Sequence, residues 1–243
     1  MANITSVKAI QILDSRGLPT VSCRVETDDG LSAISKVPSG ASTGEREALE
    51  LRDGDNEYLG KGVLKAVKNI NTKCADVLIG MDAGNQFEID QALIDLDGTP
   101  AKKNLGANAI LAASIATLRS GAKSAKLPLY EHVNNLYCSE FKANKQLSLP
   151  VPMLNIINGG EHANNNIDIQ EFMVMPIGAQ SFNECMQWAI EIYGALKSLL
   201  ASKGLSTAVG DEGGFAPDLK SNQEAIELIL KSIEDCGLEA GKD

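Results

Sequence analysis

No apolar run in this sequence approaches the length of a membrane span, and the first ten residues, MANITSVKAI, lack the apolar stretch of a signal peptide. We therefore expect a soluble, cytoplasmic protein. Positive charge is also scarce, because 22 lysines and arginines stand against 32 aspartates and glutamates and leave a net charge of −10. Such a field repels nucleic acids and anionic membranes, so neither is expected as a direct partner.

Cysteine spacing excludes two further kinds of structure. The five cysteines are odd in number and widely scattered, and none forms a C-x-x-C pair. This pattern does not build a disulfide framework or a zinc site, and it is typical of reduced thiols in the cytosol. A chain of 243 residues is long enough to bury a substantial core, in one large domain or two smaller ones, and to be an enzyme.

The first part of the chain predicts a small α+β domain. Three β-rich runs, with turn residues between the second and the third, predict an antiparallel meander: Ile4–Leu13, Thr20–Thr27 and Leu31–Val37. From Glu45 onward apolar residues recur at helical spacing, and an alanine-rich helix is predicted over 105–126. We assign residues 1–137 to this domain and residues 138–149 to a linker.

The remainder, residues 150–243, alternates between strands and helices. Strands are predicted over Val151–Ile157, Phe172–Ile177 and Thr207–Val209, and capping boxes start two helices at Ser181 and Ser221. This order predicts the opening of a parallel α/β array. A closed barrel of that type needs about 250 residues, and a segment of this length holds only about three of its strands. We therefore expect either a small open sheet or a fragment of a barrel.

Three polar, glycine-containing segments are candidate site walls. NGGEHANNNIDIQEF, at 158–172, lies between two strands, where side chains of α/β proteins converge on ligands, but a solvated surface turn has the same composition. GDEGGF, at 210–215, places Asp211 and Glu212 after a strand. Adjacent carboxylates disfavour each other's ionisation, which suits one of them to act as a general acid, although an ordinary acidic turn also fits. PSGASTG, at 38–44, is either a flexible linker or a lid that closes on a ligand.

Together with several longer blocks, these segments resemble the enolase family. The matching blocks run in order along essentially the whole chain: ILDSRG (12–17) with PT (19–20), PSGASTG (38–44), ELRDGD (50–55), YLGKGV (58–63), LDGTP (96–100), LGANAI (105–110), PMLNIINGG (152–160), QEFM (170–173) and LSTAVGDEGGFAP (205–217). Blocks of this length in this order are highly specific. Leu18, Asn164 and Gly194 depart from the residues that are usual in the family.

The resemblance implies a fold and a reaction. The fold is an α+β amino-terminal domain followed by the opening strands and helices of an enolase-type α/β (TIM-like) barrel, truncated, whose second strand runs antiparallel. The reaction is the reversible dehydration of 2-phosphoglycerate to phosphoenolpyruvate in glycolysis, with Mg²⁺ as cofactor. A lysine removes the proton next to the substrate carboxylate, two magnesium ions stabilise the enolate, and a glutamic acid protonates the departing hydroxyl. The resemblance also implies a homo-oligomer, either a dimer or an octamer, and some bacterial members reach the cell surface or are secreted.

Carried over residue by residue, the resemblance assigns roles to five positions. Glu212 matches the proton donor, and Glu171 is a catalytic residue that cooperates with it when the hydroxyl leaves. Gln170 and His162 line the substrate pocket, and Ser42 closes on the second magnesium ion and the phosphate. The other histidine, His132, has no such match and is interpreted as a helix-end residue.

The remaining catalytic groups of the family are expected outside this sequence. Its acidic metal ligands, its base lysine and its phosphate-binding arginine and serine would all lie beyond Asp243. The leading hypothesis is therefore the amino-terminal part of an enolase. The alternative is a catalytically incomplete product that acts at most as a binding or assembly module.

Overall fold

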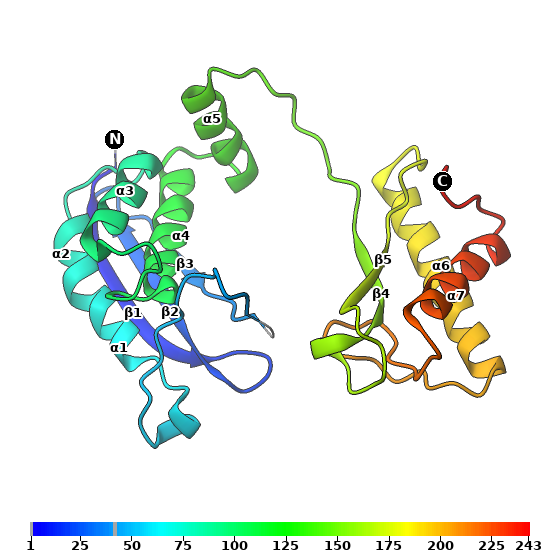
Figure 1. The fold of residues 1–243 in the computed structure, drawn as a ribbon. Helices are drawn as coiled ribbons and strands as arrows, with labels where there is room; N and C mark the ends of the chain where they lie inside the picture. The colour runs from blue at the N-terminus through cyan, green and yellow to red at the C-terminus, as the bar shows by residue number, and fades with distance from the viewer. Residues whose placement is uncertain (1, 41–42) are drawn as a thin grey trace. The chain divides into compact units, whose positions relative to one another are not determined.

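The structure of the protein is a computed structural model that describes residues 2–40 and 43–243 (Figure 1). The chain divides into two compact units, Met1–Leu147 and Ser148–Asp243. The sequence predicted a linker at 138–149, and helix α5 (Leu129–Phe141) extends into the first residues of that segment. The rings of Tyr137 and Phe141, one helical turn apart, lie 4.9 Å from each other in this last part of the helix. Residues 142–153, all of them described, contain neither helix nor strand.

The sheet of the first unit is an antiparallel meander, as the sequence predicted. Strands β1 (Ile4–Leu13), β2 (Pro19–Thr27) and β3 (Ser32–Lys36) lie in the order β1-β2-β3. Gly17 and Gly30 have positive φ angles in the two turns, a conformation that costs glycine little. The predicted strand bounds and the observed ones agree within one residue at each end.

Helix α4 (Ala107–Ser124) covers one face of this sheet and contacts both β2 and β3 (Figure 1). The helix approaches closely because its inner face consists of small residues, and Ala112, Ala113 and Ala116 are completely buried. The Ser35 hydroxyl on β3 donates to the Ala112 carbonyl at 2.6 Å, which fixes the helix against the strand. The other helical elements of this unit are η1 (Glu57–Gly60), α1 (Leu64–Asn69), η2 (Ile70–Cys74), α2 (Ala75–Leu78), α3 (Gln86–Asp97) and α5.

The second unit contains strands β4 (Leu154–Asn158) and β5 (Glu171–Val174), the short helix η3 (Gly160–His162) and the long helices α6 (Phe182–Ser202) and α7 (Asn222–Asp235). The serine half of both predicted capping boxes is confirmed, whereas Glu184 and Glu224 accept from the N–H of the residue before each serine. The hydroxyls of Ser181 and Ser221 accept hydrogen bonds at 3.2 Å from the backbone N–H groups of Glu184 and Glu224, respectively. These bonds satisfy N–H groups that a helix N-terminus leaves unpaired.

The prediction of a parallel array from the residues alone is wrong for the first pair of strands. β4 and β5 are antiparallel, as the family resemblance implied. Thr207–Val209 is not a regular strand either, because Val209 and Phe215 form only an isolated antiparallel bridge. The turn between them folds the chain back, and Phe215 forms a parallel bridge with Ile157 of β4. These two bridges place residues 210–215, called the acidic turn below, beside the end of β4.

The structure also describes the state of the cysteines and the length of the helices. All five cysteines are free thiols, and Cys23 and Cys74 are completely buried in the core of the first unit. Within residues 2–40 and 43–243, the helices are all too short or too polar to cross a lipid bilayer.

Candidate active site

Two loops of the second unit meet where strand β4 ends and strand β5 begins. Asn158, the last residue of β4, pairs with Glu171, the first residue of β5. The chain leaves β4 through η3, which carries His162, and Glu212 lies in the turn just before Phe215. Strand ends are the usual position of functional side chains in α/β proteins, because polar groups from several loops converge there on a rigid support.

His162, Glu171 and Glu212 form one cluster. The Nδ1 atom of His162 lies 3.2 Å from Oε2 of Glu212 and 3.8 Å from Oε1 of Glu171. The ligand atoms of all three side chains lie within 4.8 Å of one another. The histidine side chain is only 3% exposed, whereas the two carboxylates are 35% and 40% exposed. A small molecule can therefore reach the carboxyl groups, while the imidazole beneath them holds their position.

The backbone of the acidic turn is tied to both strands through Asn158. This side chain is completely buried; its Oδ1 accepts from Gly214 N at 2.9 Å, and its Nδ2 donates to Gln170 O at 3.3 Å. Phe215 completes the link, since its N–H donates to Ile156 O and its carbonyl accepts from Asn158 N, both at 2.9 Å. One amide side chain therefore positions the loops that carry Glu171 and Glu212.

A second set of contacts fixes the tip of the turn. The backbone N–H of Asp211 donates to the carbonyl of His162 at 3.0 Å. The hydroxyl of Tyr193, on α6, donates to Gly213 O at 2.8 Å, and its ring stacks on Phe215 with centroids 4.3 Å apart. The turn is thus held by aromatic packing as well as by hydrogen bonds.

Glycine is required at two positions of the turn because the neighbouring loop approaches so closely. A Cβ atom on Gly210 would lie 2.5 Å from the carbonyl oxygen of His162 and 2.9 Å from Cβ of Asn158. A Cβ atom on Gly214 would lie 2.7 Å from Oδ1 of Asn158. The glycines around the carboxylate pair therefore allow the contact between two loops, a role that only the structure reveals.

The five predicted site residues have different positions. The structure brings Glu212, Glu171 and His162 together, as described above. Gln170 precedes β5 and is exposed, and its backbone carbonyl is the acceptor for Asn158. Ser42 lies outside the described residues.

Asn155 is a site residue that sequence reasoning missed. Its Nδ2 donates to Oε2 of Glu212 at 3.4 Å, and its buried Oδ1 has no hydrogen-bond partner among the residues that the structure describes. The available signal was an amide in the first half of the strand LNIIN, between apolar residues. A polar side chain inside a buried strand needs a partner, and here that partner is the carboxyl group of Glu212.

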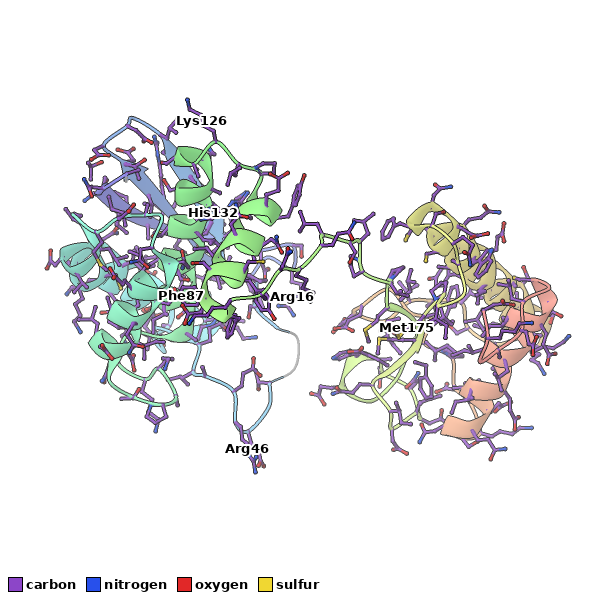
Figure 2. The ribbon with its side chains drawn as sticks, turned by 90° about the horizontal axis from the view of Figure 1, so that it is seen from above. Arg16, Arg46, Phe87, Lys126, His132 and Met175 are labelled. Carbon is purple, nitrogen blue, oxygen red and sulfur yellow. The ribbon has the colours of Figure 1, made fainter. Side chains whose placement is uncertain are left out.

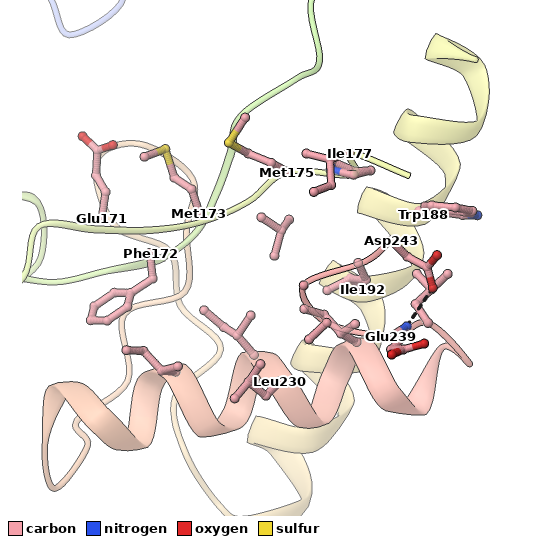
Figure 3. A pocket seen from close by; sticks show the side chains of 18 of the residues that line it. Glu171, Phe172, Met173, Met175, Ile177, Trp188, Ile192, Leu230, Glu239 and Asp243 are labelled. Atoms are coloured by element: carbon pink, nitrogen blue, oxygen red, sulfur yellow. Dashed lines mark hydrogen bonds between the residues drawn. The ribbon is translucent and has the colours of Figure 1, made fainter. Parts of the chain in front are cut away.

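A cavity of about 660 Å³ lies between β5 and helices α6 and α7 (Figure 3). Its walls are apolar and include Phe172, Ile192 and Leu230. Glu171 contributes to one end, but Figure 3 shows its carboxylate turned away from Ile192 and Leu230. The cavity therefore offers mainly apolar packing surface, with the Glu171 carboxylate turned away from that surface.

The cluster can bind a cation, but it does not fit magnesium. Mg²⁺ prefers an octahedron of oxygen ligands, usually carboxylates and water, whereas this group includes the nitrogen of a buried imidazole. Within the described part of the chain, no other group of three histidine, cysteine or acidic side chains places its ligand atoms this close together. The described residues therefore do not supply a magnesium site of the usual kind.

The fold and the site define a class of protein. An α+β unit precedes a second unit in which carboxylates at the strand ends surround a histidine, and acid–base chemistry at strand ends is typical of enzymes built on barrel domains. Comparison with known families makes the assignment specific. Residues 4–133 match the family model of the enolase N-terminal domain, and residues 146–242 match that of the enolase C-terminal TIM barrel domain. The chain belongs to the enolase family.

Proposed function

We propose that this protein acts in the reversible dehydration of 2-phosphoglycerate to phosphoenolpyruvate, the glycolytic reaction of enolases. The observation that supports this most is the convergence of Glu212, Glu171 and His162 within 4.8 Å at the strand ends. The resemblance gives each of these residues a place in that one reaction. Their shared location is what a common substrate would require.

In the proposed reaction Glu212 is the general acid. Its carboxyl group gives a proton to the hydroxyl group on C3 of the substrate, the C–O bond breaks, and the hydroxyl leaves as water. The electron pair of the enolate then forms the carbon–carbon double bond. His162 and Asn155 both lie beside Oε2 of Glu212, at 3.2 and 3.4 Å, and orient the acid toward the substrate.

The other proposed roles come from the family resemblance, and for Glu171 and Gln170 their positions also support them. Glu171 lies beside the same Nδ1 atom of His162 as Glu212 and cooperates in the departure of the hydroxyl group. Gln170 is exposed next to it and contacts the substrate. Ser42 is proposed to close on the phosphate and on the second magnesium ion.

We also propose Mg²⁺ as the cofactor, a homo-oligomer as the assembly and the cytoplasm as the location, as in the family generally. Magnesium would stabilise the charge of the enolate when bound. Neither Glu171 nor Glu212 forms an ion pair with a lysine among the described residues. Glu171 and Glu212 are therefore proposed to act in protonation of the leaving hydroxyl, and not in removal of the C2 proton by a lysine.

A second candidate function is a binding or assembly module without catalysis. The observation that favours it is the apolar surface beside β5, where Met173, Met175 and Ile177 are all more than two-fifths exposed. Surfaces of this kind are common at protein interfaces. A module of this sort would use the second unit for contact rather than for chemistry.

A turnover assay separates the two functions. Protein produced from its natural reading frame and free of host enolase should convert 2-phosphoglycerate with Mg²⁺, and ultraviolet absorbance follows the phosphoenolpyruvate that forms. Failure to form product would reject the dehydration reaction and leave the binding module. A polypeptide of residues 1–243 should form no product, because its described residues offer no magnesium site of oxygen ligands. Turnover by that polypeptide would show that residues 1–243 carry out the whole reaction and not only the acid step.

A further inference from the structure

A small acidic cavity in the first unit is independent of the candidate active site. It has a volume of about 190 Å³, and its walls include Ala2, Asp29, Asp82, Gly121, Ser124 and His132. That volume corresponds to about six water molecules at ~30 Å³ each. The cavity is therefore large enough for a short organic molecule.

His132 contributes an unpaired polar atom to this cavity. The residue lies in the first turn of α5 and is only 6% exposed, and its Nε2 has no hydrogen-bond partner in the described ranges 2–40 and 43–243 (Figure 2). Burial lowers the pKa of this imidazole, so at neutral pH the ring is uncharged and can accept a hydrogen bond. Buried polar atoms without a partner are rare in native proteins, and they mark places where something else binds.

Asp82 is held in place by the backbone. Its Oδ1 accepts from Ala2 N at 3.2 Å and from Gly84 N at 3.0 Å. The loop that carries Asp82 packs tightly on α4, because a Cβ atom on Gly121 would collide with the carbonyl of Ala83. The carboxylate is thus a rigid part of the wall rather than a mobile surface group.

Asp29 is fixed on another part of the wall. Its Oδ1 accepts from the Thr27 hydroxyl at 2.6 Å and from Leu31 N at 3.1 Å. Hydrogen bonds from the hydroxyls of Thr27 and Ser124 lower the pKa of this carboxyl group, so it remains ionised at neutral pH. No lysine or arginine in the described part of the chain lines the cavity to balance the two aspartates.

The spacing of these groups selects the kind of cation. Asp29, Asp82 and His132 do not bring three ligand atoms within 4.8 Å of one another, unlike the cluster around His162. One metal ion, whose ligands lie about 2–2.5 Å from it, therefore cannot bind all three directly. A cation with two separate donor groups can reach them.

We propose that this cavity binds a short aliphatic diammonium ion, with its two charged ends on Asp29 and Asp82 and one N–H group donating to Nε2 of His132. Two positive charges match the two carboxylates. Each ammonium group carries three N–H donors, which suits walls that offer acceptors on several sides. A four-carbon diamine has six non-hydrogen atoms, which matches the space for about six water molecules.

The two histidines of the chain provide the measurement. In protein labelled only at histidine, the ring signals of His132 and His162 are resolved by NMR, and the first reports on the cavity while the second reports on the candidate active site. Titration with 1,4-diaminobutane should shift the His132 signal until it saturates. The dissociation constant read from this shift should be at least about tenfold lower than that read from any shift of the His162 signal. Butylamine, with one charge, should bind more weakly. The neutral 1,4-butanediol and MgCl₂ at matched ionic strength should leave the His132 signal in place.

Two variants test the contacts. Asp82→Asn keeps the acceptor for the backbone N–H groups and removes the charge, so it should weaken diamine binding about tenfold. Asp76→Asn removes an exposed charge from α2 and should have no effect. His132→Phe keeps a ring and removes Nε2, so it should weaken binding as well. Because this variant lacks the His132 signal, its binding is read in uniformly ¹⁵N-labelled protein from the amide signal of Ala125, which also lines the cavity. Circular dichroism establishes that each variant is folded.

Four outcomes would overturn the proposal. They are the absence of a saturable shift at His132, an equal shift with butanediol or MgCl₂, equal weakening by Asp82→Asn and Asp76→Asn, and unchanged binding in folded His132→Phe. The first would show a cavity filled by water. The second and third would show a general effect of solvent or charge, and the last would show that the imidazole takes no part.

Discussion

The Nδ1 atom of His162 lies 3.2 Å from Oε2 of Glu212, although the two residues belong to different loops. The loops are also joined through their backbones by the bond from Asp211 N to His162 O. A buried ring thus supports a carboxyl group that solvent can reach. The position of the proposed acid therefore depends on protein contacts that exist without substrate.

Asn158→Ala should destabilise the second unit. The side chain accepts from the N–H of buried Gly214, and its removal leaves that donor without a partner, whereas Gln170 O keeps its hydrogen bond from Gly159 N. A lost partner of this kind costs about 1–3 kcal/mol in the free energy of unfolding. Chemical denaturation followed by circular dichroism measures the difference. Asn164→Ala, at an exposed position in the same loop, is the matched control, and an equal change in the two variants would contradict the bridging role.

Two glycine substitutions should act in opposite directions. Gly210→Ala places a Cβ atom 2.5 Å from the carbonyl oxygen of His162, so it should separate the two loops, lower stability and change the NMR signal of His162. Gly194→Ala lies inside α6 with no atom within 4 Å of the new Cβ, so it should raise helix stability by about 0.5–1 kcal/mol. Thermal unfolding of both variants checks the pair. Stabilisation by Gly210→Ala would show that the loop contact is not as tight as described.

A polypeptide of residues 1–243 should self-associate as its concentration rises. Met175 and Ile177, which follow β5, are 45% and 59% exposed beside the apolar cavity. Contact between such surfaces removes apolar area from water. Sedimentation velocity at several concentrations measures it, and Ile177→Lys should reduce it. Ile190→Lys changes an equally exposed residue on α6, and an equal effect there would point to net charge rather than to this surface.

Stability should fall in alkaline solution because of two buried thiols. Burial raises the pKa of Cys23 from 9.0 to about 12 and that of Cys74 from 9.0 to about 11. Above about pH 9 the unfolded chain loses these protons while the folded chain keeps them, so the free energy of unfolding decreases until the folded values are reached. Denaturation at several pH values measures the slope. Cys23→Ala should make it shallower, and an unchanged slope would assign the effect to other groups.

Local structure could be predicted from the sequence wherever short-range chemistry decides it. β1 and the two helix starts are examples, because a β-rich run and a serine three positions before a glutamate act within a few residues. The direction of β5 relative to β4 could not be predicted from the residues, since an apolar run does not state which neighbour it pairs with or in which sense. The family resemblance provided that information.

The site was predictable in part for the same reason. Polar, glycine-rich segments after strands marked the loops that bring His162, Glu171 and Glu212 together. Asn155 and Tyr193 were missed because their roles depend on loops distant in sequence: the first contacts Glu212 and the second donates to Gly213. An amide in a strand or a tyrosine on a helix has many ordinary uses, and only the tertiary contacts distinguish these two.

The most direct test of the account measures two reactions of Glu212→Gln in protein produced from its natural reading frame. Glutamine has nearly the same shape but cannot protonate the leaving hydroxyl, so dehydration of 2-phosphoglycerate should fall by about 100-fold or more, while exchange of the C2 hydrogen with solvent continues. Glu161→Gln, an exposed glutamate next to His162, should change neither rate. NMR in deuterated water follows exchange and product in one sample. Retained exchange with lost dehydration is the predicted result, and equal loss of both while substrate still binds would contradict the assignment of Glu212 as the acid.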